Sequence, residues 1–148
     1  MVTSVFIPGN QDITEPLDIR REVFVEEQGR TEEEEFDGFD ETALHLMVYV
    51  DEAPAATGRI WHDGGFRIGR LAVRKQFRGQ NIGDLALRLL IYKAFSTGAE
   101  VLNISACSEL APFYKKFGFK ETADAQGVPI EMSVKKDEVV YPSACGRQ

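Results

Sequence analysis

The hydrophobic period of the chain changes from strand-like to helical across one glycine-containing turn. Upstream of the turn, apolar residues alternate with polar ones in three segments joined by short turns, which is typical of an antiparallel meander. These segments are residues 44–50, 55–62 and 66–74. Downstream, residues 82–97 carry apolar residues at helical spacing, and Gly98 is placed to end that helix. A strand-like segment follows at 101–106. A strand, a helix and a returning strand predict a parallel crossover on an otherwise antiparallel sheet.

The other segments complete an α+β fold with one mixed sheet of about six to seven strands and about four helices. Residues 2–7 are expected to form the first strand, and Thr14 to cap a helix from about Glu15 to Gln28. A short helix is expected from Ser108 or Glu109 to Phe117, and residues 119–122 and 130–136 are expected to close a hairpin around Gln126 and Gly127. We expect one domain over residues 1–148, with a core at about 4–136 and a C-terminal tail at 137–148.

Charge is distributed unevenly along the 148 residues, of which 43% are hydrophobic and which carry a formal net charge of −7. Residues 1–42 hold thirteen acids and three bases, whereas residues 67–93 hold seven bases and one acid. The overall negative charge argues against nonspecific nucleic-acid binding, because it repels phosphates at long range. The acidic segment 30–41 is too charged to be core, which predicts a solvated loop or a short helix.

Neither secretion nor membrane insertion is indicated. The N-terminus lacks the basic residues and cleavage site of a signal peptide, and no apolar run approaches 18 residues. Cys107 and Cys145 are far apart, and His45 and His62 are the only histidines, so no metal site is expected. These features favour a cytoplasmic protein with two reduced thiols.

The segment from Arg70 to Leu85 is expected to run from strand through a glycine-containing turn into a helix. Backbone N–H groups of such a turn, at the positive end of a helix dipole, form a site for a pyrophosphate. The seven bases of residues 67–93 coincide with this turn. A P-loop would need Gly-Lys followed by Ser or Thr, and a dinucleotide fold would place its glycines after the first strand of a βαβ unit. The sequence shows neither arrangement.

The turn resembles the acetyl-coenzyme A motif of the GCN5-related N-acetyltransferase family, Q/R-x-x-G-x-G/A. Arg78 and Gly83 match this motif, while Asn81 replaces its middle glycine; asparagine tolerates a left-handed backbone better than other non-glycine residues. Two further segments are similar to the family. Residues 112–119 resemble its F-Y-x-K-x-G-F segment, and residues 19–28 resemble the L-R-x-E-V-F-V-x-E-Q helix of its ElaA/YjcF-like branch. The resemblance covers about residues 4–136.

The resemblance implies a single-domain acyl-CoA N-acyltransferase fold that transfers an acetyl group from acetyl-CoA directly to a primary amine in a ternary complex. It implies that backbone groups of Leu71, Ala72 and Val73 and the turn residues Arg78, Gly79, Gln80, Asn81, Ile82, Gly83 and Asp84 bind the cofactor. Tyr114 would protonate the departing thiolate, and Cys107 would face the cofactor. Cys107 could alternatively be a covalent nucleophile, although no histidine stands near it in sequence, which favours a structural thiol.

The general base is left open among several residues. Glu26 and Glu27 end the first helix, and Ser105 or His45 could act through ordered water, although each also suits a purely structural role. The resemblance implies that the first helix and the loop after it wall the acceptor site. The acidic residues Glu32–Glu35, Asp37, Asp40 and Glu41 would then attract a cationic, polyamine-like or lysine-like amine, or would form a plain solvated loop.

Two other functions remain possible from the sequence. A binding module that senses coenzyme A without catalysis is consistent with Asn81 and with the lack of a glutamate on the strand before the turn. A relative of acyl-homoserine-lactone synthases shares the acidic first helix, but the chain is short for that class. The edge of the C-terminal hairpin is a candidate surface for a homodimer.

Overall fold

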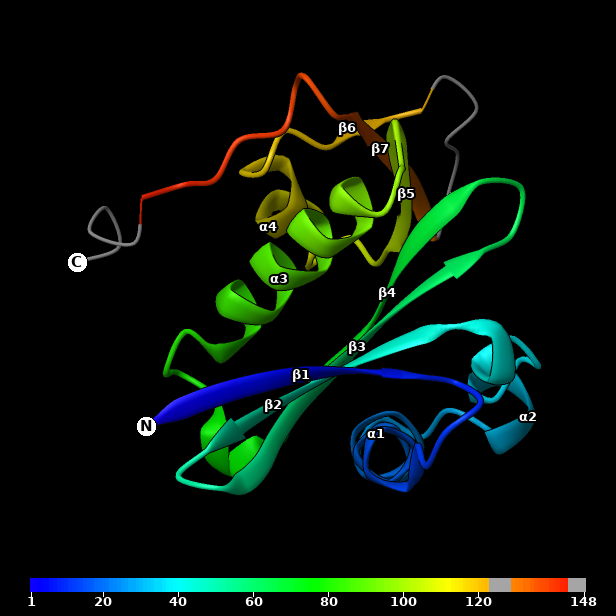
Figure 1. Cartoon of the computed structure of the whole chain (residues 1–148), viewed down its shortest axis with the longest axis vertical. Coiled ribbons are helices and arrows are strands. Elements are labelled where there is room, and N and C mark those ends of the chain that lie inside the picture. Colours follow the sequence, from blue (N-terminus) through cyan, green and yellow to red (C-terminus); the bar gives the residue numbers. More distant parts are fainter. Residues whose placement is uncertain (123–128, 144–148) are drawn as a thin grey trace.

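The structure is a computed structural model that describes residues 1–122 and 129–143. Within these residues, seven strands form one sheet in the order β1-β2-β3-β4-β5-β7-β6. The strands are β1 (Val2–Pro8), β2 (Leu44–Val50), β3 (Ala53–His62), β4 (Phe66–Val73), β5 (Val101–Ala106), β6 (Lys120–Glu121) and β7 (Ile130–Lys135). The α-helices are α1 (Thr14–Arg20), α2 (Glu32–Glu35), α3 (Ile82–Ser96) and α4 (Ala111–Lys115). Figure 1 shows α3 and α4 on one face of the sheet and α1 and α2 towards the other. The α+β fold predicted from the sequence is confirmed.

Strand pairing follows the predicted meander and crossover. Strands β1 to β4 pair antiparallel in chain order, and β4 then pairs in parallel with β5, which is reached through α3. Strand β7 pairs antiparallel with both β5 and β6. The sheet is therefore mixed and mostly antiparallel, with β1 and β6 at its edges. The turn expected around Gln126 and Gly127 lies outside the described residues.

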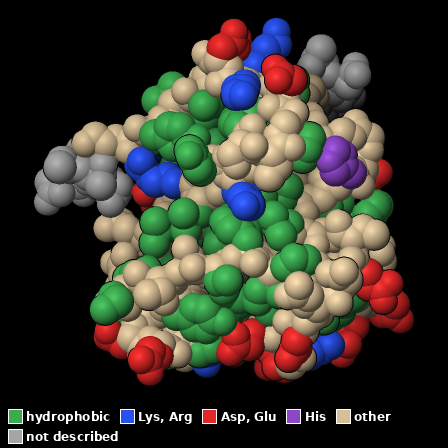
Figure 2. Space-filling model, viewed as in Figure 1, with side chains coloured by type: hydrophobic (Ala, Val, Ile, Leu, Met, Phe, Trp, Pro, Cys, Tyr) green, Lys and Arg blue, Asp and Glu red, His purple; other side chains and the backbone are tan. Residues whose placement is uncertain are grey.

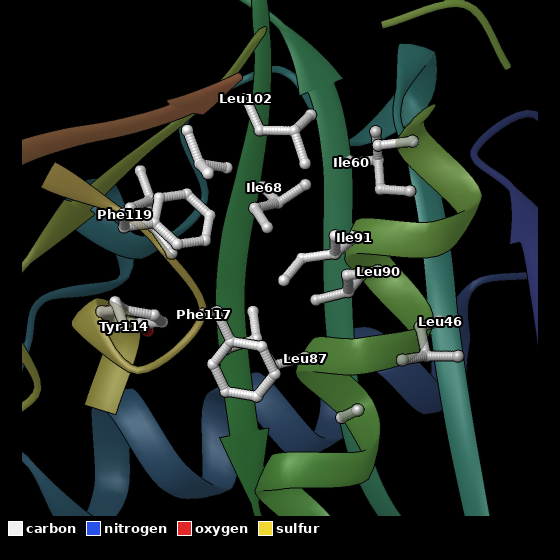
Figure 3. Close-up of a cluster of buried hydrophobic side chains, with 14 of the residues drawn as sticks. Leu46, Ile60, Ile68, Leu87, Leu90, Ile91, Leu102, Tyr114, Phe117 and Phe119 are labelled. Carbon is white, nitrogen blue, oxygen red and sulfur yellow. The ribbon is translucent and has the colours of Figure 1, made fainter. Parts of the chain in front are cut away.

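Helix α3 packs its apolar face against the sheet and forms the main core (Figure 3). Leu90 and Ile91 of α3 are fully buried, and Gly58 on β3 lies so close to the helix that a Cβ there would be 2.6 Å from a Leu90 methyl carbon. Gly58 thus lets the helix approach the strand closely. The helix ends before Gly98, whose φ of +115° makes it the predicted stop. Across the described residues, no helix combines the length and apolar character needed to cross a membrane.

The first helix differs from the single α-helix expected over residues 15–28. After α1, the chain continues as a π-helix, η1 (Arg21–Glu27), in which the Gln28 amide donates to the Val23 carbonyl 3.1 Å away. Thr14 is the first helical residue rather than the cap, because the Asp12 carboxylate accepts hydrogen bonds from its amide and hydroxyl groups. A π-helical turn is frequent at functional sites, and Glu27, the last residue of η1, forms an ion pair with Arg78 of the turn after β4.

A β-bulge interrupts β4 before its last residues. Thr57 pairs with Ala72 and Arg59 with Gly69, so two residues of β4 face the single residue Gly58 of β3. The first of them, Arg70, has a φ of +50°, a left-handed backbone that costs a non-glycine residue free energy. Such bulges redirect the backbone and often lie beside active sites. The ladder between β4 and β5 comprises the single pair Arg67–Asn103, which leaves the two strands free to part beyond it.

Candidate active site

The turn between β4 and α3 lines a pocket of about 310 Å³. A short 3₁₀ turn, η3 (Lys75–Phe77), leads into Gly79 and Asn81, whose φ angles are +80° and +65°. The left-handed backbone expected at Asn81 is thereby confirmed. A turn of this kind at the start of a helix directs backbone N–H groups towards an anion. A Cβ at Gly79 would meet no atom within 4 Å, so the space beside the turn is open.

The conformation of Asn81 provides a test of this turn. We expect Asn81→Ala to be less stable than Asn81→Gly by about 1 kcal/mol, because alanine adopts a left-handed backbone only at a cost that glycine does not incur. Denaturant unfolding of the two variants measures this difference. The same pair of substitutions at the exposed neighbour Gln80 is the control. Equal stabilities of the two Asn81 variants would contradict the assigned conformation.

The arginines of the basic stretch are largely neutralised within the protein. The pairs are Arg67 with Glu131, Arg70 with Glu35 and Asp37, Arg74 with Glu22, Arg78 with Glu27, and Arg88 with Asp84. The stretch is thus not the bare basic patch that the sequence suggested. Another cation, Lys116, lines the pocket from the end of α4. Lys116 had no predicted role, although its position two residues after Tyr114, in the segment that resembles the family, could have indicated one.

A second pocket, of about 390 Å³, continues from the first along the end of β4. Both pockets are lined by Val73, Gly83 and Phe113, so together they form one cleft, which we call the β4–α4 cleft. Leu71, Ala72 and Val73 line it from β4, and Leu110, Phe113 and Tyr114 line it from the region of α4. The structure therefore brings the predicted strand residues, the turn and Tyr114 together along one cleft.

Tyr114 projects from α4 towards β4 (Figure 3) and is 5% exposed. Its ring packs against Phe113 and Phe119, with centroid distances of 5.3 and 6.1 Å. Burial, reinforced by the nearby Cys107 thiol, raises the pKa of Tyr114 to about 12. The phenol is therefore protonated at neutral pH and has a proton to donate into the cleft.

The four candidate bases are not brought together. Glu27 binds Arg78, with 2.8 Å between Oε1 and Nη2, and this hydrogen bond lowers the pKa of its carboxyl. Glu26 is exposed and lines neither part of the cleft. His45 is fully buried, its Nε2 lies 2.9 Å from the Asp40 carbonyl oxygen, and burial lowers its pKa. Only Glu27 thus adjoins the cleft, and its ion pair makes it a poor proton acceptor.

Ser105 lies in a separate pocket of about 350 Å³, which we call the β4–β5 pocket. Its lining residues are Trp61, Asp63, Arg67, Ile68, Gly69, Arg70, Ser105 and Glu131. Asp63 and Glu131 were not predicted from the sequence as site residues. The strand alternation of residues 130–136 offered a partial signal for Glu131, but its pairing with Ser105 depends on the β5–β7 register.

Two of the predicted cofactor residues lie at the margin of the cleft. Gln80 is exposed, and its amide nitrogen lies 3.5 Å from the Gln76 carbonyl oxygen. Cys107 is an exposed free thiol directly after β5, close enough to Tyr114 to influence its pKa. Neither residue lines the pockets described above.

The acidic segment is fixed to the sheet by buried ion pairs, which corrects the expectation that it is too charged to be core. Figure 2 shows acidic side chains along the edge where α1 and α2 lie, but Glu35 is 0% exposed and binds Arg20 and Arg70 at 2.8 and 3.0 Å. The other pairs among the same residues are Arg20 with Asp40, Arg59 with both Asp37 and Asp40, and Arg70 with Asp37. We call these six residues the buried ion cluster. Its carboxylates are already neutralised and are not available to attract an acceptor.

Asp37 in this cluster is partly buried. Burial by itself would raise its pKa, but the hydrogen bonds and positive charge of Arg59 lower the pKa of Asp37 to about 2. A carboxyl with a depressed pKa contributes stability above its unfolded value and loses it as the pH falls towards the folded value. The contribution of Asp37 is therefore fully present at neutral pH.

Comparison with known proteins agrees with this arrangement. Residues 10–129 match the family model described as the acetyltransferase (GNAT) domain. The uncharacterized N-acetyltransferase YjcF of Bacillus subtilis strain 168 is 33% identical over 141 residues, which cover 90% of this chain and 99% of YjcF.

Solved structures show the same fold. An acyl-CoA N-acyltransferase from Pseudomonas aeruginosa has a TM-score of 0.79 and 26% identity, with 90% of this chain and 99% of that chain covered. Escherichia coli ElaA has a TM-score of 0.73 and 23% identity, with 91% and 100% covered. The left-handed turn before α3, the bulged strand and the extent of these matches lead to one conclusion: the chain belongs to the GNAT acetyltransferase family.

Proposed function

We propose that the protein transfers an acetyl group from acetyl-CoA to a primary amine by direct attack in a ternary complex. The observation that carries this proposal is the continuous β4–α4 cleft, which runs from an anion-binding turn at Gly79–Gly83 to the protonated phenol of Tyr114. The Pseudomonas aeruginosa neighbour, described as an acyl-CoA N-acyltransferase, supports an acyl-CoA donor.

The residues of the cleft fit acetyl-CoA. The open space beside Gly79 and the left-handed Asn81 suit a pyrophosphate bound by backbone N–H groups, and Lys116 adds a positive charge. The apolar side chains of Leu71, Val73 and Phe113 suit the pantetheine chain. When bound, acetyl-CoA supplies an activated thioester, and the protein supplies position and charge.

Two groups of the chain would act on the thioester of bound acetyl-CoA. The bulge at Arg70 and Leu71 takes backbone groups out of the ladder with β3, and Leu71 lines the cleft, where a freed N–H would polarise the thioester carbonyl. Tyr114 would donate its proton to the departing thiolate. Cys107 has no assigned covalent role, because it lines no part of the cleft and no histidine activates it.

The proposal is tested by the reaction itself. Purified protein is incubated with acetyl-CoA and a panel of primary amines, the released thiol is followed with time, and acetylated amine is identified by mass spectrometry. We expect amine-dependent thiol release and initial-rate lines that intersect rather than run parallel, as direct attack requires. Cys107→Ser is expected to retain the activity.

The two alternatives, a CoA-sensing module and a covalent mechanism through Cys107, predict different results. Binding of CoA by calorimetry, without acetylation of any amine in the panel, would identify a sensor module and overturn the proposal. Parallel initial-rate lines, with activity lost in Cys107→Ser, would replace direct attack by a covalent mechanism. Thiol release without an amine sets the background rate.

A further inference from the structure

The β4–β5 pocket lies on the sheet face opposite α3. Leu102 and Ile104 of β5 pack beneath α3, so the alternate residue Ser105 points to the other face. Glu131 pairs with Ser105 in the β5–β7 ladder and lies beside it on that face. The function proposed above assigns no role to this pocket.

The pocket and the β4–α4 cleft meet across the sheet at the bulge of β4. Arg67 pairs with Asn103 in the parallel ladder, so Gly69 and Ser105, two residues further along each strand, are level. Gly69 lines the pocket, and Leu71, directly beyond the bulge, lines the cleft. A molecule in the pocket would therefore face the end of the cleft from the opposite side of the sheet.

The two arginines of the pocket are already compensated by carboxylates of the protein. Arg67 Nη2 lies 3.0 Å from Glu131 Oε1 and donates to Ser105 Oγ at 2.7 Å. Arg70 is paired with Glu35 and Asp37 of the buried ion cluster. An acceptor with its own carboxylate would have to break one of these pairs, at a cost in free energy.

Of the two carboxylates in the lining, Asp63 is exposed, and the Glu131 side chain is 41% exposed although it is paired with Arg67, so both remain accessible to a cation, unlike the buried Glu35. Asp63 is exposed at the β3–β4 turn and forms no ion pair with any residue in the described part of the chain. Glu131 is held by Ser105, which donates to its Oε2, and by Arg67. Burial alone would raise the pKa of Glu131, but these hydrogen bonds lower it, so the group is a carboxylate at neutral pH. Trp61 adds an apolar surface beside them.

We propose that the β4–β5 pocket binds the amine acceptor and selects a diamine, with Asp63 binding its second ammonium group. The reacting nitrogen would lie between Glu131 and the bulge, and the alkyl chain would lie along Trp61. This inference rests on the proposed acetyl transfer. It places the acceptor charge at Asp63 and Glu131 rather than in the acidic segment 30–41.

Three acceptors of equal chain length test the proposal: 1,4-diaminobutane, 1-aminobutane and 4-aminobutanoate. We expect kcat/KM for the diamine to exceed that for the monoamine by about tenfold, the effect of one charged hydrogen bond, and the amino acid to be the poorest. In Asp63→Asn, the ratio of diamine to monoamine should fall to about one. Asp137→Asn, an exposed aspartate after β7, should keep the wild-type ratio.

A binding measurement separates failure of this inference from failure of the proposed function. Calorimetry of 1,4-diaminobutane with the CoA-loaded protein should show binding that Asp63→Asn and Glu131→Gln each weaken. If amines are acetylated but the diamine has no advantage and Asp63→Asn does not change the ratio, the inference is overturned and the transfer reaction stands. If the diamine binds through Asp63 but no amine is acetylated, the pocket assignment stands and the transferase function fails. Absence of both binding and transfer overturns both.

Discussion

Replacing Tyr114 by phenylalanine is expected to lower kcat by about 100-fold, the lower range for loss of a general acid, with little change in the Kd of CoA. The substitution removes the hydroxyl but keeps the ring that packs against Phe113 and Phe119. The phenol lines one part of the β4–α4 cleft, whereas Gly79 and Asn81 of the turn proposed to bind the pyrophosphate line the other part. The substitution should therefore lower kcat without weakening CoA binding. Steady-state kinetics measures kcat, and calorimetry measures the Kd of CoA.

The pH profile gives a second readout for Tyr114. A general acid acts while it is protonated, so a pKa of about 12 keeps this phenol active throughout the range in which an amine of pKa ~10 becomes a nucleophile. We expect kcat of the wild type to rise with pH without a falling limb near pH ~10, the value of an ordinary tyrosine. If kcat of the wild type instead falls near that pH, and Tyr114→Phe abolishes the fall, burial does not raise the pKa of Tyr114.

A control separates loss of the acid from general damage. Tyr92→Phe makes the same chemical change on α3, where the side chain is 69% exposed. This variant should keep both kcat and the free energy of unfolding. An unchanged kcat in Tyr114→Phe would remove Tyr114 from the mechanism.

Replacing Glu35 by glutamine is expected to lower the free energy of unfolding by about 3 kcal/mol. Removing one partner of a buried ion pair costs ~3–5 kcal/mol because a buried charge loses its compensation. The effect should lie at the lower end, since Asp40 and Asp37 still bind Arg20 and Arg70. For a chain of this size we expect Tm to fall by about 10 °C. Denaturant and thermal unfolding measure the two quantities.

The neighbouring Glu33 provides the matched control. It lies in the same helix α2 but is exposed, so Glu33→Gln should change the free energy of unfolding by less than about 0.5 kcal/mol. Equal stabilities of Glu33→Gln and Glu35→Gln would show that the acidic segment is a solvated loop, as its composition alone suggested. The comparison tests tertiary position, because residue type and helix are the same.

The backbone of the site was largely predictable from local sequence. The change of hydrophobic period at the turn predicted β4, α3 and β5 in order, because period reflects which face of each element is buried. The left-handed Asn81 followed from an intrinsic property of asparagine. The resemblance to the family predicted Tyr114 as a site residue, and the structure places Tyr114 along the β4–α4 cleft. The π-helical end of the first helix was not predicted, because one extra residue in a helical turn barely changes the spacing of the apolar residues.

The sequence by itself determined the order of strands and helices, the turn between β4 and α3 and the family, since each depends on residues close together in the chain. Only the tertiary structure decided which charged side chains are buried in ion pairs and which line a pocket. Glu35 is buried because Arg20 and Arg70 reach it from other elements, and Glu131 shares a pocket with Asp63 because β4, β5 and β7 are neighbours in the sheet. The free energy of a charged side chain depends on its burial and on partners a few ångströms away. Here those partners are tens of residues distant along the chain, so the local sequence does not identify them.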